Sequence, residues 1–435
     1  MPANITAGLG SVFVALGHQK LKADGQLSLV LPRALLSGVA WKETRKLLGN
    51  NYHVKYIVVS HEPGNWNFSE NTQLSECLIV AQRTKPHFES EPTKVVNLWT
   101  KPKSSVEALT LASLIRQATG ASLDALSGSE ELHTDNRKYG EIILCRSADI
   151  KKEKWNEAAV FAQTELCRAA HFLSRGRVFV PGSGVVGKIP LTQLKSIADI
   201  GPDRRDIHDG FKVTSQETEY PAYWGHDTES TQSIAQHPNK HLMALPRAQK
   251  GRNLRDAHLL WSRSGRLLVA ERLWLLTTRV LAVRVDQQVL SNTWWPVATH
   301  AEGARREVWE KILSLWFNST PGVLSLIGAR VDTRGAWVEL KKPILEEIAV
   351  LDPRKLSKKA QVQLCRTYDE VSRLQIQPLP SINTDAVHKT IDAALASTLR
   401  IRDNLGRLRD MLAREPIVSM RLPYEASKYP EVAVS

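Results

Sequence analysis

The sequence predicts an α/β protein in which a partial sheet is followed by a mixed α+β region and C-terminal helices. Over the first hundred residues, amphipathic helical stretches alternate with short continuous apolar runs, a pattern typical of strands buried in a covered sheet. From about residue 177 to 350, the chain carries many short apolar runs separated by Pro and Gly. A length of 435 residues with 42% hydrophobic residues suits about three globular domains.

The first elements follow in order along the chain. SVFVALGHQKLK has helical spacing of its apolar residues and ends at Asp24-Gly25. QLSLVLP (26–32) reads as a buried strand, and ALLSGVAWKETRKLL reads as a helix closed by Gly49. HVKYIVVSH (53–61) and LSECLIVAQR (74–83) are two strands joined by a 12-residue loop instead of a helix. We expect these two strands to pair antiparallel at the edge of an otherwise parallel sheet.

The later elements are less regular. Strands are expected over 94–99 and 141–145, on either side of a helix near 104–118. A long amphipathic helix is expected over about 151–174, and a last helix over about 384–414. The predicted domain organisation has four parts, which cover residues 1–100, 101–176, 177–350 and 351–435.

Charge and cysteine content restrict the class of protein. The formal net charge of +13 and the pI of about 9.5 favour polyanionic partners, nucleic acid above all, although a merely basic soluble protein remains an alternative. The four cysteines are scattered without a CxxC pair, which predicts reduced thiols, a cytoplasmic protein and no zinc site. The N-terminus has no signal-peptide pattern, and Glu271, Arg272 and Arg279 interrupt the most apolar long stretch, so no membrane span is expected.

A glycine-rich segment, RVFVPGSGVVGKIP (177–190), superficially matches two phosphate-binding motifs. Ile189 stands where a phosphate loop needs Ser or Thr, and Pro190 prevents a helix from starting in the required register. The segment therefore predicts a loop that enters the next domain, with Lys188 as a candidate DNA-phosphate contact.

Positive charge is concentrated between residues 240 and 285. This stretch holds ten Lys or Arg residues against two acids, as a surface that follows DNA phosphates requires. The segments HLLWSR, GRLLVAERLW and TTRVLAVRV are interpreted as successive strands, and PRAQKGRNLRD as an exposed loop. A solvated charged sheet face is the alternative. The candidate DNA-binding residues here are Arg247, Lys250, Arg252, Arg255, Arg263, Arg266 and Arg272.

One family resembles this sequence. GLGSVFVALGHQKLKADGQLSLVLPRALLSGVAWKETRKLL, followed by SENTQLSECLIVAQR, resembles the C-terminal half of the catalytic domain of bacterial DNA adenine (amino-) methyltransferases of the restriction-modification and phage-defence type. The resemblance covers about residues 6–84. It implies a partial methyltransferase (Rossmann-like) sheet with an antiparallel edge hairpin. The stretch with GARVDTRGAWVELKK is similar in layout to the target recognition domains of large adenine methyltransferases.

The motifs that carry the family's chemistry are absent from this sequence. The chain contains no Asn/Asp-Pro-Pro-aromatic tetrapeptide and no glycine-rich cofactor turn ahead of the resembling segment. The resemblance implies that this chain by itself has no catalytic residues and no cofactor, and that S-adenosylmethionine belongs to the complete enzyme. It also implies a protein partner that carries the N-terminal half.

The loop GNWNFSENT corresponds to the loop that helps to hold the flipped adenine in this family. Phe68 is the first candidate for stacking on the base, followed by Trp66, with Asn71 beside them; a hydrophobic plug beneath the loop is the alternative. Two functions remain open. The chain is either the DNA-binding, target-recognition portion of a DNA adenine methyltransferase, or a non-catalytic DNA-binding specificity subunit of a defence complex.

Overall fold

A computed structural model of the protein describes residues 4–70, 72–84, 91–134, 137–225, 230–334 and 337–424. These residues form two compact units. Unit 1 takes its described residues from Met1–Arg168, Asp332–Ala336 and Met411–Ser435, and unit 2 takes its residues from Ala169–Val331 and Trp337–Asp410. Three elements cross these boundaries: α5 (Thr164–Leu173), β20 (Val331–Arg334) and α13 (Gly406–Arg414).

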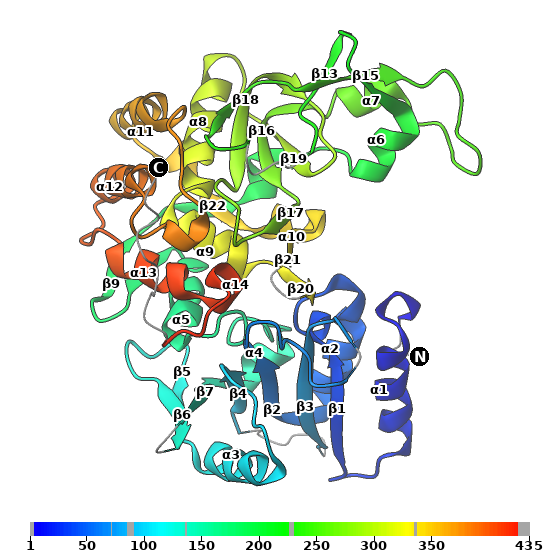
Figure 1. The fold of residues 1–435 in the computed structure, drawn as a ribbon, viewed down its shortest axis with the longest axis vertical. Coiled ribbons are helices and arrows are strands. Elements are labelled where there is room, and N and C mark those ends of the chain that lie inside the picture. The colour runs from blue at the N-terminus through cyan, green and yellow to red at the C-terminus, as the bar shows by residue number, and fades with distance from the viewer. Residues whose placement is uncertain are drawn as a thin grey trace, which may run out of the picture. The chain divides into compact units, whose positions relative to one another are not determined.

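Unit 1 is built on one seven-stranded mixed sheet with the strand order β1-β3-β2-β4-β7-β5, and β6 also pairs with β7 (Figure 1). Its strands are β1 (Gln26–Pro32), β2 (Tyr52–Ser60), β3 (Glu76–Arg83), β4 (Thr93–Leu98), β5 (Ala121–Ser122), β6 (Glu130–Thr134) and β7 (Arg137–Cys145). Its helices are α1 (Leu9–Lys20), α2 (Lys42–Asn51), α3 (Ser105–Gln117), α4 (Ser147–Lys151) and α14 (Pro416–Ser419). The α/β class predicted from the sequence is confirmed.

The three strands predicted from the resembling segment lie in this sheet. β3 pairs antiparallel with β2 and also with β1, so that it lies between them and β1 forms the edge. The sheet is less parallel than expected, because only the β2–β4 and β5–β7 pairs run parallel. Strands β4 to β7 extend the sheet beyond β2, so the predicted boundary at residue 100 falls inside a single sheet.

Helix α1 runs alongside the β1 edge (Figure 1). Glycines on one side of the helix allow this approach, since a methyl group at Gly10 would lie only 3.2 Å from Leu31 Cδ2. The other side of α1 carries exposed apolar side chains at helical spacing: Leu9, Phe13 and Leu16 are 74%, 60% and 40% exposed.

The predicted long helix over 151–174 forms only in part: α5 covers its C-terminal portion, and the preceding segment is irregular. This irregular segment is buried from residue 158 to 162. Asn97 Nδ2 donates a hydrogen bond to the carbonyl of Ala158, and Trp99 Nε1 donates one to that of Ala162, both at 2.9 Å. Side chains at the C-terminal end of β4 therefore satisfy carbonyls that a helix would satisfy within itself.

Unit 2 contains several small sheets around a central five-stranded sheet with the order β11-β19-β16-β18-β14. The strands are β8 (Arg177–Val180), β9 (Gly184–Lys188), β10 (Leu191–Gln193), β11 (Ala198–Ile200), β12 (Phe211–Thr214), β13 (Tyr220–Ala222), β14 (Ala235–Gln236), β15 (Lys240–Ala244), β16 (Gly265–Ala270), β17 (Arg272–Trp274), β18 (Ala282–Val289), β19 (Trp294–Thr299), β21 (Trp337–Glu339) and β22 (Ala349–Leu351). The helices are α6 (Arg204–Gly210), α7 (Ala257–Trp261), α8 (Ala304–Phe317), α9 (Thr320–Gly328), α10 (Lys342–Glu347), α11 (Lys358–Val371) and α12 (Ala386–Leu399).

Helices α8 and α9 supply much of the core of unit 2, where Trp316 and Phe317 are fully buried. Asn318, also fully buried, joins α8 to the central sheet by accepting from Leu281 N and donating to the carbonyl of Ala282 at 2.7 Å. Because both groups of the amide are satisfied, this buried side chain fixes the position of the helix end on the sheet.

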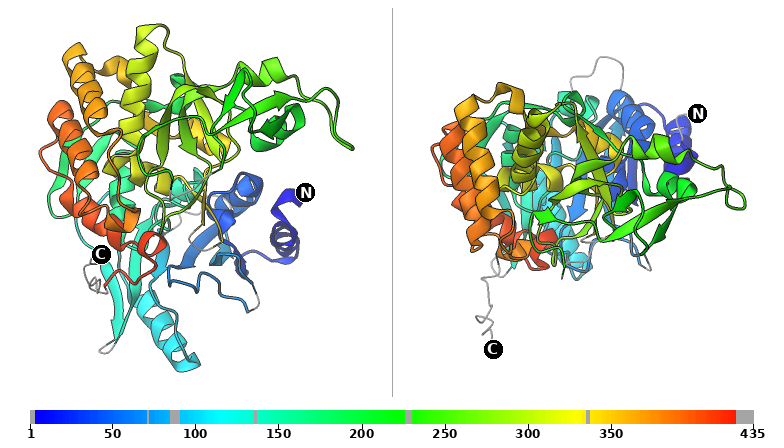
Figure 2. Two further views of the ribbon diagram at one scale, coloured as in Figure 1. Left: turned by 45° about the horizontal axis from the view of Figure 1, so that its top comes forward. Right: turned by 90° about the horizontal axis from the view of Figure 1, so that it is seen from above.

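A lobe at one end of unit 2 is formed by α6, α7 and the sheet β12-β15-β13, and the loop between β15 and α7 projects from it (Figures 1 and 2). Its core is a separate hydrophobic cluster that includes Ile207, Phe211, Tyr220 and Leu260. Because the lobe has its own small core, both ends of the projecting loop are held in fixed positions.

Three predicted elements of unit 2 differ in the structure. HLLW, predicted as a strand, is helix α7, because the Asp256 side chain accepts from Leu259 N at 3.1 Å and caps the first turn. The last predicted helix is interrupted where Arg400 takes a left-handed conformation after α12. The glycine-rich loop is a hairpin of β8 and β9, and Gly182 and Gly184 have positive φ in its turn.

Candidate nucleic-acid interface

A basic groove of about 750 Å³ opens in unit 2 beside the lobe. Six Lys or Arg side chains line it against two acids, so the wall of the groove is strongly cationic. The lining residues are Asp203, Arg204, Arg205, His208, Gln249, Arg252, Glu271, Arg272, Asn292, Thr293, Trp295, Lys341, Lys342 and Pro343.

Helix α6 places two of these cations. Its N-cap, Asp203, accepts a hydrogen bond from Asp206 N at 3.0 Å, so that Arg204 and Arg205 occupy the first turn. Both arginines are exposed, and neither makes an ion pair within the described part of the chain. Two unneutralised guanidinium groups are thus available to an anion entering the groove.

Strands β17 and β21 place two more cations. Arg272 stands opposite Glu339 in their antiparallel register, and its Nη2 lies 2.8 Å from Glu339 Oε1. Lys341 Nζ lies 2.7 Å from the same oxygen. Burial alone would raise the pKa of Glu339, but the hydrogen bonds from Lys341 and Arg272 hold it below its ordinary value.

The remaining lysine is anchored to the backbone. Lys342 Nζ donates to the carbonyls of Ile200 and Gly201, at 2.8 and 3.1 Å. Burial lowers the pKa of this ammonium group, and the neighbouring Arg263 lowers it further. Lys342 therefore helps to hold β11 beside α10 in addition to its charge at the groove.

The projecting loop is attached to α6 at the groove. Gln249 Nε2 donates to the carbonyl of His208 at 3.2 Å, and Arg252 Nη1 lies 3.0 Å from Asp209 Oδ1. Arg252 is about half exposed, whereas the carboxylate of Asp209 is largely buried. The guanidinium group of Arg252 can therefore contact a phosphate from its exposed side while it keeps its bond to Asp209.

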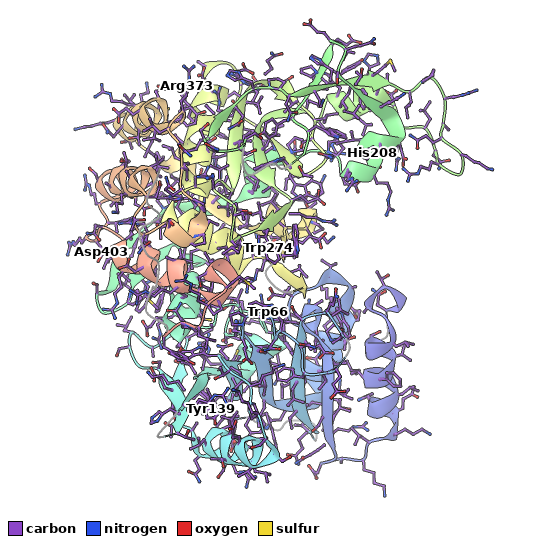
Figure 3. The ribbon with its side chains drawn as sticks, viewed as in Figure 1. Trp66, Tyr139, His208, Trp274, Arg373 and Asp403 are labelled. Atoms are coloured by element: carbon purple, nitrogen blue, oxygen red, sulfur yellow. The ribbon has the colours of Figure 1, made fainter. Side chains whose placement is uncertain are left out.

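His208 lies on α6 at the edge of the groove, where Figure 3 labels it, and its ring meets that of Trp224 edge to face at 5.5 Å. Burial lowers the pKa of His208, and the positive charges of Arg204 and Arg252 lower it further, while Asp209 acts in the opposite direction. The ionisation of this imidazole is therefore coupled to its burial first and to the charges of the two arginines second.

Of the residues predicted from the sequence, Arg252 and Arg272 lie in the groove. Arg266 instead approaches Glu310, which is also paired with the buried Arg284 at 3.1 Å. The basic stretch therefore does not form one positive face, because strand alternation turns part of it into the interior of unit 2. The other predicted residues lie outside the groove lining and are exposed: Lys188, Arg247, Lys250, Arg255 and Arg263.

The predicted base-stacking loop belongs to unit 1. Trp66 is buried, and Phe68 packs against the core cluster that includes Val58 and Leu98. Glu76 Oε2 accepts from the backbone N–H of Phe68 and Ser69, both at 2.7 Å, and so holds the loop in place. This packing favours the plug beneath the loop, and base stacking stays a prediction; Asn71 lies outside the described residues.

Most residues of the groove are not among the DNA-binding residues predicted from the sequence. Arg204, Arg205 and Lys341 lie outside the basic stretch, and nothing local distinguishes them from solvated charges. The available signals were the adjacent pairs in PDRRD and ELKKP, each beside a proline that marks an element boundary.

The described residues contain no group of three or more His, Cys, Asp or Glu side chains that could hold a metal ion. Within the same residues, no helix is both long and apolar enough to span a bilayer.

No protein-family model matches the sequence, and a search of curated proteins also finds no match. Among solved structures, the chain is similar to one titled as the crystal structure of the type IIG restriction endonuclease BpuSI. The TM-score is 0.36 and the sequence identity 12%, over 94% of this chain and 48% of that chain. The chain thus spans about half the length of that structure.

Proposed function

We propose that unit 2 binds double-stranded DNA through the basic groove, as the target-recognition portion of a DNA adenine methyltransferase. The observation that carries the proposal is the cationic lining, in which Arg204 and Arg205 have no ion-pair partner among the described residues. Arginine is well suited to this role, because its planar guanidinium group can bind phosphate or a guanine edge with two hydrogen bonds.

The other cations of the groove support the same function. Arg252, Arg272 and Lys341 each have a carboxylate partner. All three side chains are about half exposed, so each can contact a phosphate from its exposed side while its largely buried carboxylate partner stays paired. The exposed arginines and lysine of the projecting loop would add phosphate contacts outside the groove.

Methyl transfer from S-adenosylmethionine to the adenine amino group enters this proposal only through a partner, since the sequence lacks the cofactor and catalytic motifs. The exposed apolar side of α1, which lies alongside the β1 edge, is suited to such a partner. The second candidate function is a non-catalytic DNA-binding specificity subunit of a defence complex.

The test compares wild-type protein with Arg204→Ala/Arg205→Ala in DNA-binding titrations at several salt concentrations. Each phosphate that the protein no longer neutralises lowers the salt slope by about 0.9, so the double variant should bind more weakly and with a slope lower by up to about 2. The matched control is Arg305→Ala/Arg366→Ala, which removes two exposed arginines of α8 and α11 outside the groove. Equal slopes for the two double variants would contradict the proposal.

A further inference from the structure

Glu271 occupies an unusual place in the basic groove. Its backbone is held from two sides, because its N–H donates to the carbonyl of Thr293 at 2.9 Å and its carbonyl accepts from Leu340 N at 2.8 Å. The residue links β16 to β17, is half-buried and lines the groove. The position of this carboxylate is therefore set by the sheet and not by a flexible loop.

The carboxylate of Glu271 makes no hydrogen bond or ion pair with any described residue. Arg272 and Lys341, whose charges act on Glu271, both direct their nitrogens to Glu339. Burial raises the pKa of Glu271, and the charge of Arg272 opposes this effect without a direct bond. A half-buried acceptor without a donor costs free energy, which a donor from a bound molecule would recover.

Two neighbouring polar groups have spare hydrogen-bonding capacity. The hydroxyl oxygen of Thr293 is buried and has no hydrogen-bond partner in the described structure. Asn292 accepts from Gly225 N at 2.8 Å through Oδ1, while none of the hydrogen bonds found among the described residues uses its Nδ2 donors. Glu271, Asn292 and Thr293 thus all belong to the lining of a groove that is otherwise rimmed by cations.

This arrangement distinguishes the parts of a nucleic acid. Phosphate is drawn to the arginines and lysines of the rim, but a phosphate at Glu271 would meet a like charge. A carboxylate instead suits the amino group that cytosine (N4) or adenine (N6) presents in the major groove. The polar set around Glu271 therefore matches a base edge and not a backbone.

We propose that Glu271 is a specificity-determining residue that accepts a hydrogen bond from the exocyclic amino group of a cytosine or adenine in the bound DNA. The inference rests on the proposed DNA-binding function. In the complex with DNA, the cations of the groove position the duplex, and Glu271 selects the base pair at one position of the site.

The experiment selects duplexes from a random library with the full chain as wild type, as Glu271→Met and as Glu302→Met. Methionine keeps the length of the side chain and removes the acceptor, and Glu302 is an exposed glutamate outside the groove. The wild type and the control should enrich the same site, with one position fixed as cytosine or adenine. Glu271→Met should lose roughly tenfold discrimination at that position while keeping its salt slope.

Base analogues then identify the group that is read. In the enriched duplex, purine replaces adenine, or 2-pyrimidinone replaces cytosine, so that only the amino group is lost. The wild type should bind the affected analogue roughly tenfold more weakly, and Glu271→Met should be insensitive to it. Which analogue weakens binding decides between the two bases.

The outcomes separate this inference from the proposed function. If Glu271→Met enriches the wild-type site with unchanged discrimination, the role of Glu271 is overturned while DNA binding stands. If the wild-type protein binds duplexes without any sequence preference, the role of Glu271 is likewise overturned while DNA binding stands. Failure of the wild-type protein to bind duplexes at all would overturn the proposed function itself.

Discussion

At the scale of single residues, the cations of unit 2 fall into groups that the sequence does not separate. Arg204 and Arg205 are exposed without ion pairs among the described residues, whereas Arg284 is buried against Glu310. All three are arginines in a basic half of the chain. Residues distant in sequence decide whether an arginine is available to a bound anion or is paired with a buried carboxylate of the protein itself.

At the same scale, the charges around His208 predict that the affinity for DNA depends on pH. In the free protein, burial and then the charges of Arg204 and Arg252 lower the pKa of this imidazole. Phosphates bound to these arginines would raise the pKa, so the complex holds more protons than the free protein. We therefore expect DNA affinity to rise as the pH falls toward the ordinary histidine value of about 6.5, and to level off below the lowered pKa.

The measurement is the dissociation constant for duplex DNA between about pH 8 and pH 5.5 at constant salt, a range that spans the ordinary histidine pKa. His208→Gln should flatten the profile. His237→Gln is the control, since His237 is exposed, pairs with Asp286 and lies outside the groove. Profiles of equal steepness for wild type and His208→Gln would refute the linkage.

At the scale of elements, local patterns predicted strands more reliably than they predicted continuous helices. The apolar runs of β1, β2 and β3 lie where expected, since a buried strand needs only an unbroken apolar stretch. The helix expected over 151–174 forms only from Thr164 onward, since Asn97 and Trp99 bind carbonyls of the preceding segment. Periodicity alone contains no information about such distant donors.

The turn between α8 and α9 yields a stability prediction. Gly322 lies in the first turn of α9, where an added Cβ would be 1.7 Å from the carbonyl oxygen of Trp316. The two helices must then separate within a fully packed core. Gly322→Ala should lower the free energy of unfolding by about 3 kcal/mol or more, at or above the upper range for overpacked cores.

Urea unfolding followed by circular dichroism measures this effect. Gly303→Ala is the matched control, because nothing lies within 4 Å of its Cβ position and only its positive φ opposes the substitution. That conformation costs an alanine about 1–2 kcal/mol. A smaller loss for Gly322→Ala than for Gly303→Ala would show that the turn adjusts without repacking the helices.

At the scale of the whole molecule, the proposal assigns DNA binding to this chain and methyl transfer to an assembly with a partner. The chain alone should bind DNA but transfer no methyl group from S-adenosylmethionine, because its sequence lacks the catalytic Pro-Pro motif and the cofactor turn. Radiolabelled methyl transfer to DNA by the purified chain is the assay, and a complete adenine methyltransferase serves as the positive control. Transfer by the chain alone would overturn the partner-dependent part of the proposal.

A partner that restores methyl transfer would also test unit 1. In that assembly, Phe68→Ala should reduce the rate if Phe68 stacks on a flipped base, as the family resemblance implies. If Phe68 only packs against the core cluster, the substitution should lower the unfolding free energy and leave the rate per folded enzyme unchanged.

The sequence by itself determined the α/β class, the three strands of the resembling segment and the basic character of the second half. These properties depend on composition and on neighbours a few residues apart. Only the tertiary structure decided which cations share a groove and that the carboxylate of Glu271 lies among them without a bonding partner in the described part of the chain. Residues from 203 to 343 meet there, and their meeting depends on sheet register and helix packing, which no local pattern encodes.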